Sequence, residues 1–241
     1  MIRRRVFSWL AAAALAMGVS GLAFSPVRSP LTLARLEMDR STKYADRFAG
    51  SSRTAGIQEA VDACSPEECT VQLSAKVYRV RKTIWLTGGV HLHGAGIGST
   101  VIQRAAGSMS DEDADGTGSV VAVSPRGSAG SFPTLKTSQA SVAVSDLTID
   151  GNASSFSALK NINLHADGIR ADYVDGLIIR HVAVRNALMN GYYIRNCKNV
   201  LMDHFRADLV GQWSQTASKN GVSLTSVSRG GFNFNYTLSH F

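Results

Sequence analysis

The stretch HADGIRADYVDGLIIRHVAVRNA (165–187) is followed directly by LMNGYYIRNCKNVLMDHFRADLV (188–210), and these two units of 23 residues decide the fold. When the units are aligned, Gly168 falls on Gly191 and His181 on His204, and apolar residues fall on apolar residues. A fixed period of this length predicts a repeat protein whose units stack along one axis.

Within each unit the apolar residues alternate in three short bursts. In the first unit these bursts are Ile169/Ala171, Leu177/Ile179 and Val182/Val184. Period two is strand spacing, so each unit should hold three short strands, which is one coil of a parallel β-helix. Leucine-rich and helical repeats do not fit, because the sequence has neither a fixed Leu/Asn consensus nor a 3.6-residue period.

Partial copies flank the two units. AVSDLTIDGN (143–152) places Leu147 thirty residues before Leu177, and NGVSLTS (220–226) repeats the start of the second unit after thirty residues. We therefore expect a period of 23 residues with seven-residue excursions. From Ser226 onward the repeat is no longer visible, which predicts a fragment or a product truncated at its C-terminus.

The amino terminus has the pattern of an export signal. Met1–Arg5 is positive, residues 6–17 are apolar, and residues 18–23 are small, so we expect cleavage after Ala23 and a secreted or periplasmic protein. The paired arginines 4 and 5 leave both the general and the twin-arginine route open. An uncleaved anchor over residues 6–24 is the alternative; after cleavage no stable membrane insertion is expected.

The remaining chain should form a linker and one domain. Residues 24–52 indicate a linker or a short helical lead-in, and residues 53–241 the β-helix domain. A hydrophobic share of 44% and a charged share of 18% exclude a disordered chain or a coiled coil. The formal charge of +7 includes three signal arginines, and no Lys/Arg run follows them. We therefore expect no nucleic-acid partner. We also expect the protein to be a monomer.

The three cysteines predict one small disulfide. Cys64 and Cys69 flank a tight polar loop and can pair in an oxidising compartment. Cys197 would then be a buried small hydrophobic residue. Their spacing matches no zinc pattern, so no metal ligands are assigned.

Residues 54–104 carry a family resemblance. TAGIQEAVDAC (54–64) reads as a short amphipathic helix, and TVQLSAKVYRV (70–80), TIWLTGGVHLHGAG (83–96) and STVIQR (99–104) as strands separated by turns. With DLTIDGN (146–152), this order resembles the pectate-lyase-like right-handed parallel β-helix superfamily. The resemblance implies an all-β, single-stranded right-handed solenoid with a short N-terminal capping helix.

The resemblance also implies a chemistry. Known members act on acidic or neutral polysaccharides as hydrolases, lyases or C5-epimerases, at the outer face of one strand column. Asp167-Gly168-Ile169 resembles a catalytic strand of polygalacturonases, but the following coil has Met189-Asn190 where a second Asp pair is needed. Residues 193–195 (Tyr-Ile-Arg) stand where the alginate epimerases carry an Asp-Pro-His triplet.

Strand alternation directs five polar side chains outward, where they should form one patch. The set comprises Asp167, Arg170, Asp172, Tyr193 and Arg195. A cation that neutralises a uronate carboxylate beside a group that moves the C5 proton is what a lyase or epimerase needs. These five are the catalytic candidates; the alternative is a solvated, salt-bridged strand surface.

Several further residues are candidates for binding. We assign substrate contact to Lys198, Gln212 and Trp213, because a loop tryptophan can stack on a sugar ring or merely cover the coil edge. The run Asp111–Asp115 (DEDAD) could hold Ca²⁺, although such a run is more often a solvated loop. His181 and His204 could form a metal or general-base pair, but a polar ladder that donates to backbone carbonyls is favoured.

Together these patterns predict a secreted protein that acts on a polysaccharide, with uronate lyase or C5-epimerase chemistry ahead of hydrolysis. A non-catalytic carbohydrate-binding or cell-surface protein on the same scaffold is the first alternative. A glycoside hydrolase or an inactive truncated relative is the second.

Overall fold

The computed structural model describes residues 41–48, 52–64, 68–106, 118–123, 139–156, 166–211, 220–225 and 236–240. They belong to one unit, residues 40–241. The expected signal peptide and most of the expected linker lie outside these residues. Across the part of the chain that the structure describes, no helix is both long and apolar enough to cross a membrane.

The strands form two sheets in which every pair is parallel. Sheet A has the order β1 (Ser41–Tyr44), β2 (Cys69–Gln72), β5 (Val90–His93), β8 (Gln139–Asp150), β10 (Val174–Arg185), β12 (Val200–Asp208) and β14 (Tyr236–Ser239), with β3 (Val77–Val80) paired to β6 (Val101–Arg104) and β6 to β8. Sheet B has the order β4 (Ile84–Leu86), β7 (Val121–Val123), β9 (Ile169–Asp172), β11 (Tyr192–Arg195) and β13 (Val222–Thr225).

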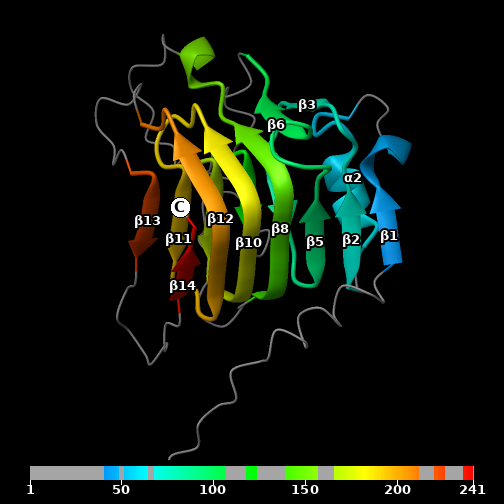
Figure 1. The fold of residues 1–241 in the computed structure, drawn as a ribbon. Helices are drawn as coiled ribbons and strands as arrows, with labels where there is room; N and C mark the ends of the chain where they lie inside the picture. Colours follow the sequence, from blue (N-terminus) through cyan, green and yellow to red (C-terminus); the bar gives the residue numbers. More distant parts are fainter. Residues whose placement is uncertain are drawn as a thin grey trace, which may run out of the picture. The chain divides into compact units, whose positions relative to one another are not determined.

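From β8 onward the chain alternates between the sheets and adds one strand to each per coil, whereas the earlier coils add two strands to sheet A (β2 and β3, then β5 and β6) and one to sheet B. Figure 1 shows β1, β2, β5, β8, β10 and β12 side by side in chain order. Parallel neighbours reached by a crossover wind in the right-handed sense. The predicted all-β, right-handed parallel β-helix is confirmed.

The register confirms the 23-residue period and corrects one earlier alignment. Ile179 pairs with Met202, 23 residues later, as the two units require. Leu147, however, pairs with Val182 rather than Leu177, so β8 precedes β10 by 35 residues instead of thirty. The prediction failed because residues 142–144 alternate like residues 147–149, and the sequence match fell on the wrong half of one long strand.

A corner divides each long strand of sheet A. The corner column consists of Asp146, His181, His204 and His240, which all have positive φ, at 57°, 50°, 49° and 52°. The left-handed conformation turns the chain, and Asp and His tolerate it better than most residues. His181 and His204 were expected one residue after a strand, but they lie within β10 and β12.

One apolar core fills the coils. Its members are almost all Val, Ile, Leu and Ala side chains that point inward from both sheets. The predicted capping helix is α2 (Ile57–Asp62), which begins three residues later than Thr54 and buries Ile57, Ala60 and Val61. Gln58 closes the edge of β4, because its side chain receives a bond from Trp85 N at 2.7 Å and donates to Trp85 O at 3.2 Å.

The β-helix begins before its expected start at residue 53, and its strand pairing continues past the last repeat that is visible in the sequence. Residues 41–44, expected in a linker, form β1 and pair with β2. Beyond Ser226, where the repeat is no longer visible in the sequence, β14 pairs with β12 through Val200↔Tyr236. In both segments the backbone pairing continues although the apolar alternation is weak.

The cysteines lie as expected. Cys64 and Cys69 form a disulfide with a Cα–Cα separation of 5.6 Å, which ties the end of the capping region to β2. Cys197 is outside the disulfide and buried, and this burial raises the pKa of its thiol to about 12. The thiol therefore stays protonated at neutral pH, and it accepts a hydrogen bond from Val174 N at 3.4 Å.

Candidate functional site

Strands β9 and β11 place the candidate side chains. In this pair Arg170 stacks on Tyr193 and Asp172 on Arg195. The alternate residues of both strands, Ile169, Ala171, Tyr192 and Ile194, are fully buried in the core. The candidates therefore lie on the opposite side of sheet B, as strand alternation predicts.

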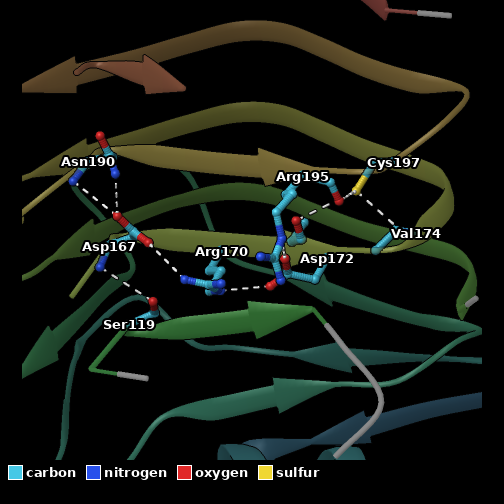
Figure 2. Close-up of polar contacts among 9 residues, drawn as sticks. Ser119, Asp167, Arg170, Asp172, Val174, Asn190, Arg195 and Cys197 are labelled. Carbon is cyan, nitrogen blue, oxygen red and sulfur yellow. Dashed lines mark hydrogen bonds and ion pairs between the residues drawn. The ribbon is translucent and has the colours of Figure 1, made fainter. Parts of the chain in front are cut away.

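Asp172 is the centre of an ion-pair network between the two coils. Its Oδ2 accepts from Arg170 Nε at 2.7 Å and its Oδ1 from Arg195 Nε at 2.5 Å. Figure 2 shows Arg195 reaching from β11 to the Asp172 carboxylate. Both oxygens of Asp172 are thus engaged by guanidinium groups.

Arg170 joins this network to its neighbours. Its Nη1 lies 3.9 Å from Asp167 Oδ2, and Figure 2 shows the two side chains facing one another. Its guanidinium carbon lies 4.9 Å from the ring centroid of Tyr193, which is a cation–π arrangement. One cation therefore contacts both Asp167 and Tyr193.

Asp167 is held on one side only. Its Oδ1 accepts from Asn190 N at 3.1 Å and from Asn190 Nδ2 at 2.7 Å. Its Oδ2 is buried and accepts no hydrogen bond from the described residues. Burial raises the pKa of Asp167 to about 6, against the opposing effects of Asn190 and Arg170.

The structure corrects the expected accessibility of this group. Asp167, Arg170 and Asp172 were expected on an outer patch, but they are only 1%, 3% and 2% exposed, while Tyr193 and Arg195 are half-buried. Alternation along a strand sets the direction of a side chain and not whether it is covered. The charges tolerate burial because opposite signs pair.

Of the three substrate-binding candidates, Lys198 is the one that lies among the described residues. Lys198 follows β11 and forms an ion pair with Asp175, with Nζ 2.9 Å from Oδ2. Gln212, Trp213 and the Asp111–Asp115 run lie outside the described residues. The sequence analysis noted Asn190 only because a hydrolase would need an aspartate at that position. In the structure Asn190 donates two hydrogen bonds to Asp167. Its position 23 residues after Asp167 could have revealed this stacking.

A second polar group lies on the corner column. Asp203 Oδ1 lies 2.9 Å from Nδ1 of both His204 and His240, and Asp146 Oδ1 lies 3.3 Å from His181 Nδ1. The rings of His181 and His204 are 4.8 Å apart, so the predicted ladder is present. Its ion-pair partners are carboxylates, whereas backbone carbonyls were expected. Hydrogen bonds from Ser239 and His240 hold the pKa of Asp203 well below its usual range.

No protein-family model matches the sequence, and no curated protein matches it. Three solved structures resemble the fold. The family 28 exopolygalacturonase of Yersinia enterocolitica has a TM-score of 0.56 at 13% identity, over 77% of this chain and 41% of that one. The surface adhesin PfbA of Streptococcus pneumoniae has a TM-score of 0.53 at 16% identity, over 83% and 47%.

The third structure is ORF18 of Geobacillus virus E2, with a TM-score of 0.53 at 17% identity, over 79% of this chain and 34% of that one. The chain thus spans between a third and a half of the length of each of these proteins. At these identities the likeness concerns the fold. Because an enzyme and an adhesin both have it, activity must be argued from the side chains.

Proposed function

We propose that this chain, which has the right-handed parallel β-helix fold of the pectate-lyase-like superfamily, acts on an acidic polysaccharide at the β9–β11 cluster. One observation carries the proposal. The half-buried Tyr193 and Arg195 are linked to a buried carboxyl, Asp167, whose pKa is raised to about 6. Tyr193 is linked to it through Arg170, and Arg195 through Asp172 and Arg170.

The side chains divide by accessibility into two roles. Tyr193 and Arg195 can touch a substrate, and these two are the proposed catalytic residues. Arg195 would neutralise the uronate carboxylate, which acidifies the adjacent C5–H, and the phenolate form of Tyr193 would take the C5 proton. In a lyase the phenol would then protonate the glycosidic oxygen as the C4–O bond breaks and the C4=C5 double bond forms. In an epimerase a proton from water would return to the opposite face of C5. Asp167, Arg170 and Asp172 are positioning residues, because they are buried and act through the other two.

Lyase or C5-epimerase chemistry fits this cluster better than hydrolysis. A glycosidase needs two carboxyl groups, one of which protonates the leaving oxygen while the other attacks or activates water. Asp172 uses both of its oxygens on Arg170 and Arg195. Of the two carboxylates in the cluster, only Asp167 therefore keeps an oxygen for proton transfer.

Binding without turnover is the second candidate, and the burial of the three positioning residues favours it. Paired charges at 1–3% exposure stabilise a surface without reaching a substrate. On this alternative Tyr193 and Arg195 are contacts for an acidic glycan. In both cases we propose a monomer exported by residues 1–23, with no nucleic-acid partner.

The two candidates separate in one assay. The purified protein is incubated with alginate, pectate and hyaluronan, with and without Ca²⁺. Ultraviolet absorbance detects the unsaturated ends of lyase products, and proton NMR detects C5 epimerisation. Binding to an immobilised glycan without any turnover would support the second candidate. Neither turnover nor binding with any glycan would contradict both.

Variants then test the assignment. Tyr193→Phe should lower the rate by about 100-fold or more if its hydroxyl transfers the proton, and Arg195→Ala should lower it as strongly. Arg206→Ala is the matched control, because Arg206 also pairs with an aspartate, Asp208, at 2.7 Å, but on sheet A and with an exposed side chain. Equal rates in all three variants would contradict the site.

A further inference from the structure

We propose that Asp203, His204 and His240 form a binding site for one divalent transition-metal ion of the zinc type. The site lies on the corner column of sheet A, whereas the β9–β11 cluster lies on sheet B. It does not depend on the proposed function.

Successive coils bring the three side chains together. Asp203 and His204 are neighbours in β12, and Asp203 pairs with Ser239 of β14. His240 therefore follows β14 as His204 follows Asp203. The φ angles of His204 and His240 are 49° and 52°, so the two imidazoles leave the backbone alike. Their rings stack with centroids 4.2 Å apart and an interplanar angle of 16°.

The donor atoms converge. One ligand atom from each of the three residues lies within 4.8 Å of the others. Asp203 Oδ1 is 2.9 Å from Nδ1 of both histidines, and it also accepts from Ser239 Oγ at 2.6 Å. Zinc–nitrogen bonds of about 2.0–2.1 Å would require small rotations of the exposed imidazoles.

The chemistry of the donors selects the ion. Two imidazoles and one carboxylate suit zinc, copper, nickel or cobalt, whereas Ca²⁺ and Mg²⁺ prefer all-oxygen ligands. Three protein ligands leave at least one position for water or another ligand.

The surroundings allow solvent entry and add one competing cation. The side chains of His204 and His240 are 48% and 67% exposed, and that of Asp203 is 22% exposed. Arg180 Nε lies 4.0 Å from Asp203 Oδ2, and the His181 ring packs on His204. A bound cation must compete with Arg180 for the carboxylate, and protonation of either imidazole opposes binding.

Zinc titration of an untagged protein tests the site. Calorimetry should give one Zn²⁺ per chain, and Co²⁺ should produce a visible absorption band. His240→Ala and Asp203→Asn should each weaken Zn²⁺ binding by at least about 10-fold. His93→Ala is the matched control, because His93 contacts Asp146 at 3.3 Å in a comparable pair, and this pair lies on the far side of His181 from the proposed site. Its affinity should equal that of the wild type.

Two outcomes would overturn the proposal. The first is the absence of stoichiometric Zn²⁺ binding, and the second is an equal loss of affinity in His93→Ala and His240→Ala. If a variant alters the circular dichroism spectrum and is therefore misfolded, the site is tested by NMR on the wild-type protein. Zinc should then shift the side-chain ¹⁵N resonances of His204 and His240, and shifts confined to other histidines would contradict the site.

Discussion

Asn190 donates two hydrogen bonds to a single oxygen of Asp167, the residue that precedes it by one 23-residue coil. The backbone nitrogen lies 3.1 Å and the side-chain nitrogen 2.7 Å from Oδ1. The other oxygen faces Arg170 Nη1 at 3.9 Å, which is too long for a hydrogen bond. Oδ1 of this carboxyl therefore links two successive coils, whereas Oδ2 accepts no hydrogen bond from the described residues and can carry a proton.

Asp167→Asn should make the protein more stable than the wild type as the pH rises. The folded pKa of about 6 exceeds the ordinary aspartate value of 3.8, so the folded state binds more protons between these values. Wild-type stability is then highest below pH 3.8 and falls as the pH rises through 6. Asparagine keeps the Oδ1 acceptor without this loss. Between pH 4 and 7 the advantage of the variant should grow by about 2 kcal/mol.

Urea unfolding at several pH values measures this difference. Asp175→Asn is the control, because Asp175 is a partly exposed carboxylate paired with Lys198. Removing its charge takes away a surface ion pair, so that variant should be no more stable than the wild type at pH 7. An Asp167→Asn advantage that shrinks with rising pH would refute the prediction.

The same ionisation should control binding of an acidic glycan. Below about pH 6 Asp167 is neutral, and Arg170, Arg195 and Asp172 leave the cluster with a net positive charge. Affinity for alginate or pectate should therefore increase as the pH falls through 6, and Asp167→Asn should remove this step. The measurement is glycan binding by calorimetry from pH 5 to 8. A step that survives in the variant would assign it to another group.

Arg195→Ala should destabilise the fold more than Arg206→Ala. Arg195 is 17% exposed and binds the buried Asp172, whereas Arg206 is 67% exposed and binds the exposed Asp208. Loss of one charged partner from buried Asp172 should cost about 1–3 kcal/mol. The surface pair should cost no more than about 0.5 kcal/mol. Equal shifts in the urea midpoint of the two variants would argue against the network.

Gly168→Ala should destabilise the coil, and Gly221→Ala should be tolerated. A Cβ on Gly168 would overlap Val184 Cγ1 and lie 2.7 Å from Gly191 O, whereas on Gly221 it would meet only Ala207 Cβ at 3.5 Å. Crowding of the first kind costs about 1–3 kcal/mol. Thermal unfolding of both variants measures the contrast, and a neutral Gly168→Ala would show that the coils can separate.

Tyr192→Phe should lower the free energy of unfolding by about 1–2 kcal/mol. The buried Tyr192 hydroxyl lies 2.8 Å from Val182 O and 3.1 Å from Arg206 O, so it joins β11 to the opposite sheet. Burial also holds the pKa of this phenol well above its usual value. Tyr44→Phe, on an exposed residue, is the control in urea unfolding. Identical midpoints for both variants would exclude the cross-core role.

The strand pairing could be predicted from the sequence wherever apolar residues alternate strongly. The alignment of Ile179 with Met202 and of Tyr192 with Ile169 follows directly from the 23-residue period. Where alternation is ambiguous, the sequence did not show whether residues 142–144 or residues 147–149 pair with Leu177 and Ile179. The structure gives this register. It also shows that β1 and β14, whose sequences alternate weakly, pair with the neighbouring strands of sheet A.

The candidate site was predicted in part. Strand alternation correctly placed Arg170, Asp172, Tyr193 and Arg195 on the outward side of adjacent coils. It could not predict that Asp172 pairs with both arginines, because that depends on side-chain reach across the stack. The meeting of His240 with Asp203 was likewise invisible, since 37 residues separate them without a recognisable repeat.

The sequence by itself determined the fold class, the coil length and the direction of each strand residue. These follow from hydrophobic periodicity, because one face of every strand must be buried. Only the tertiary structure decided which polar residues are covered and which meet. Burial and pairing depend on neighbours one coil away, and those neighbours set the pKa of Asp167 and bring His204, His240 and Asp203 to one corner.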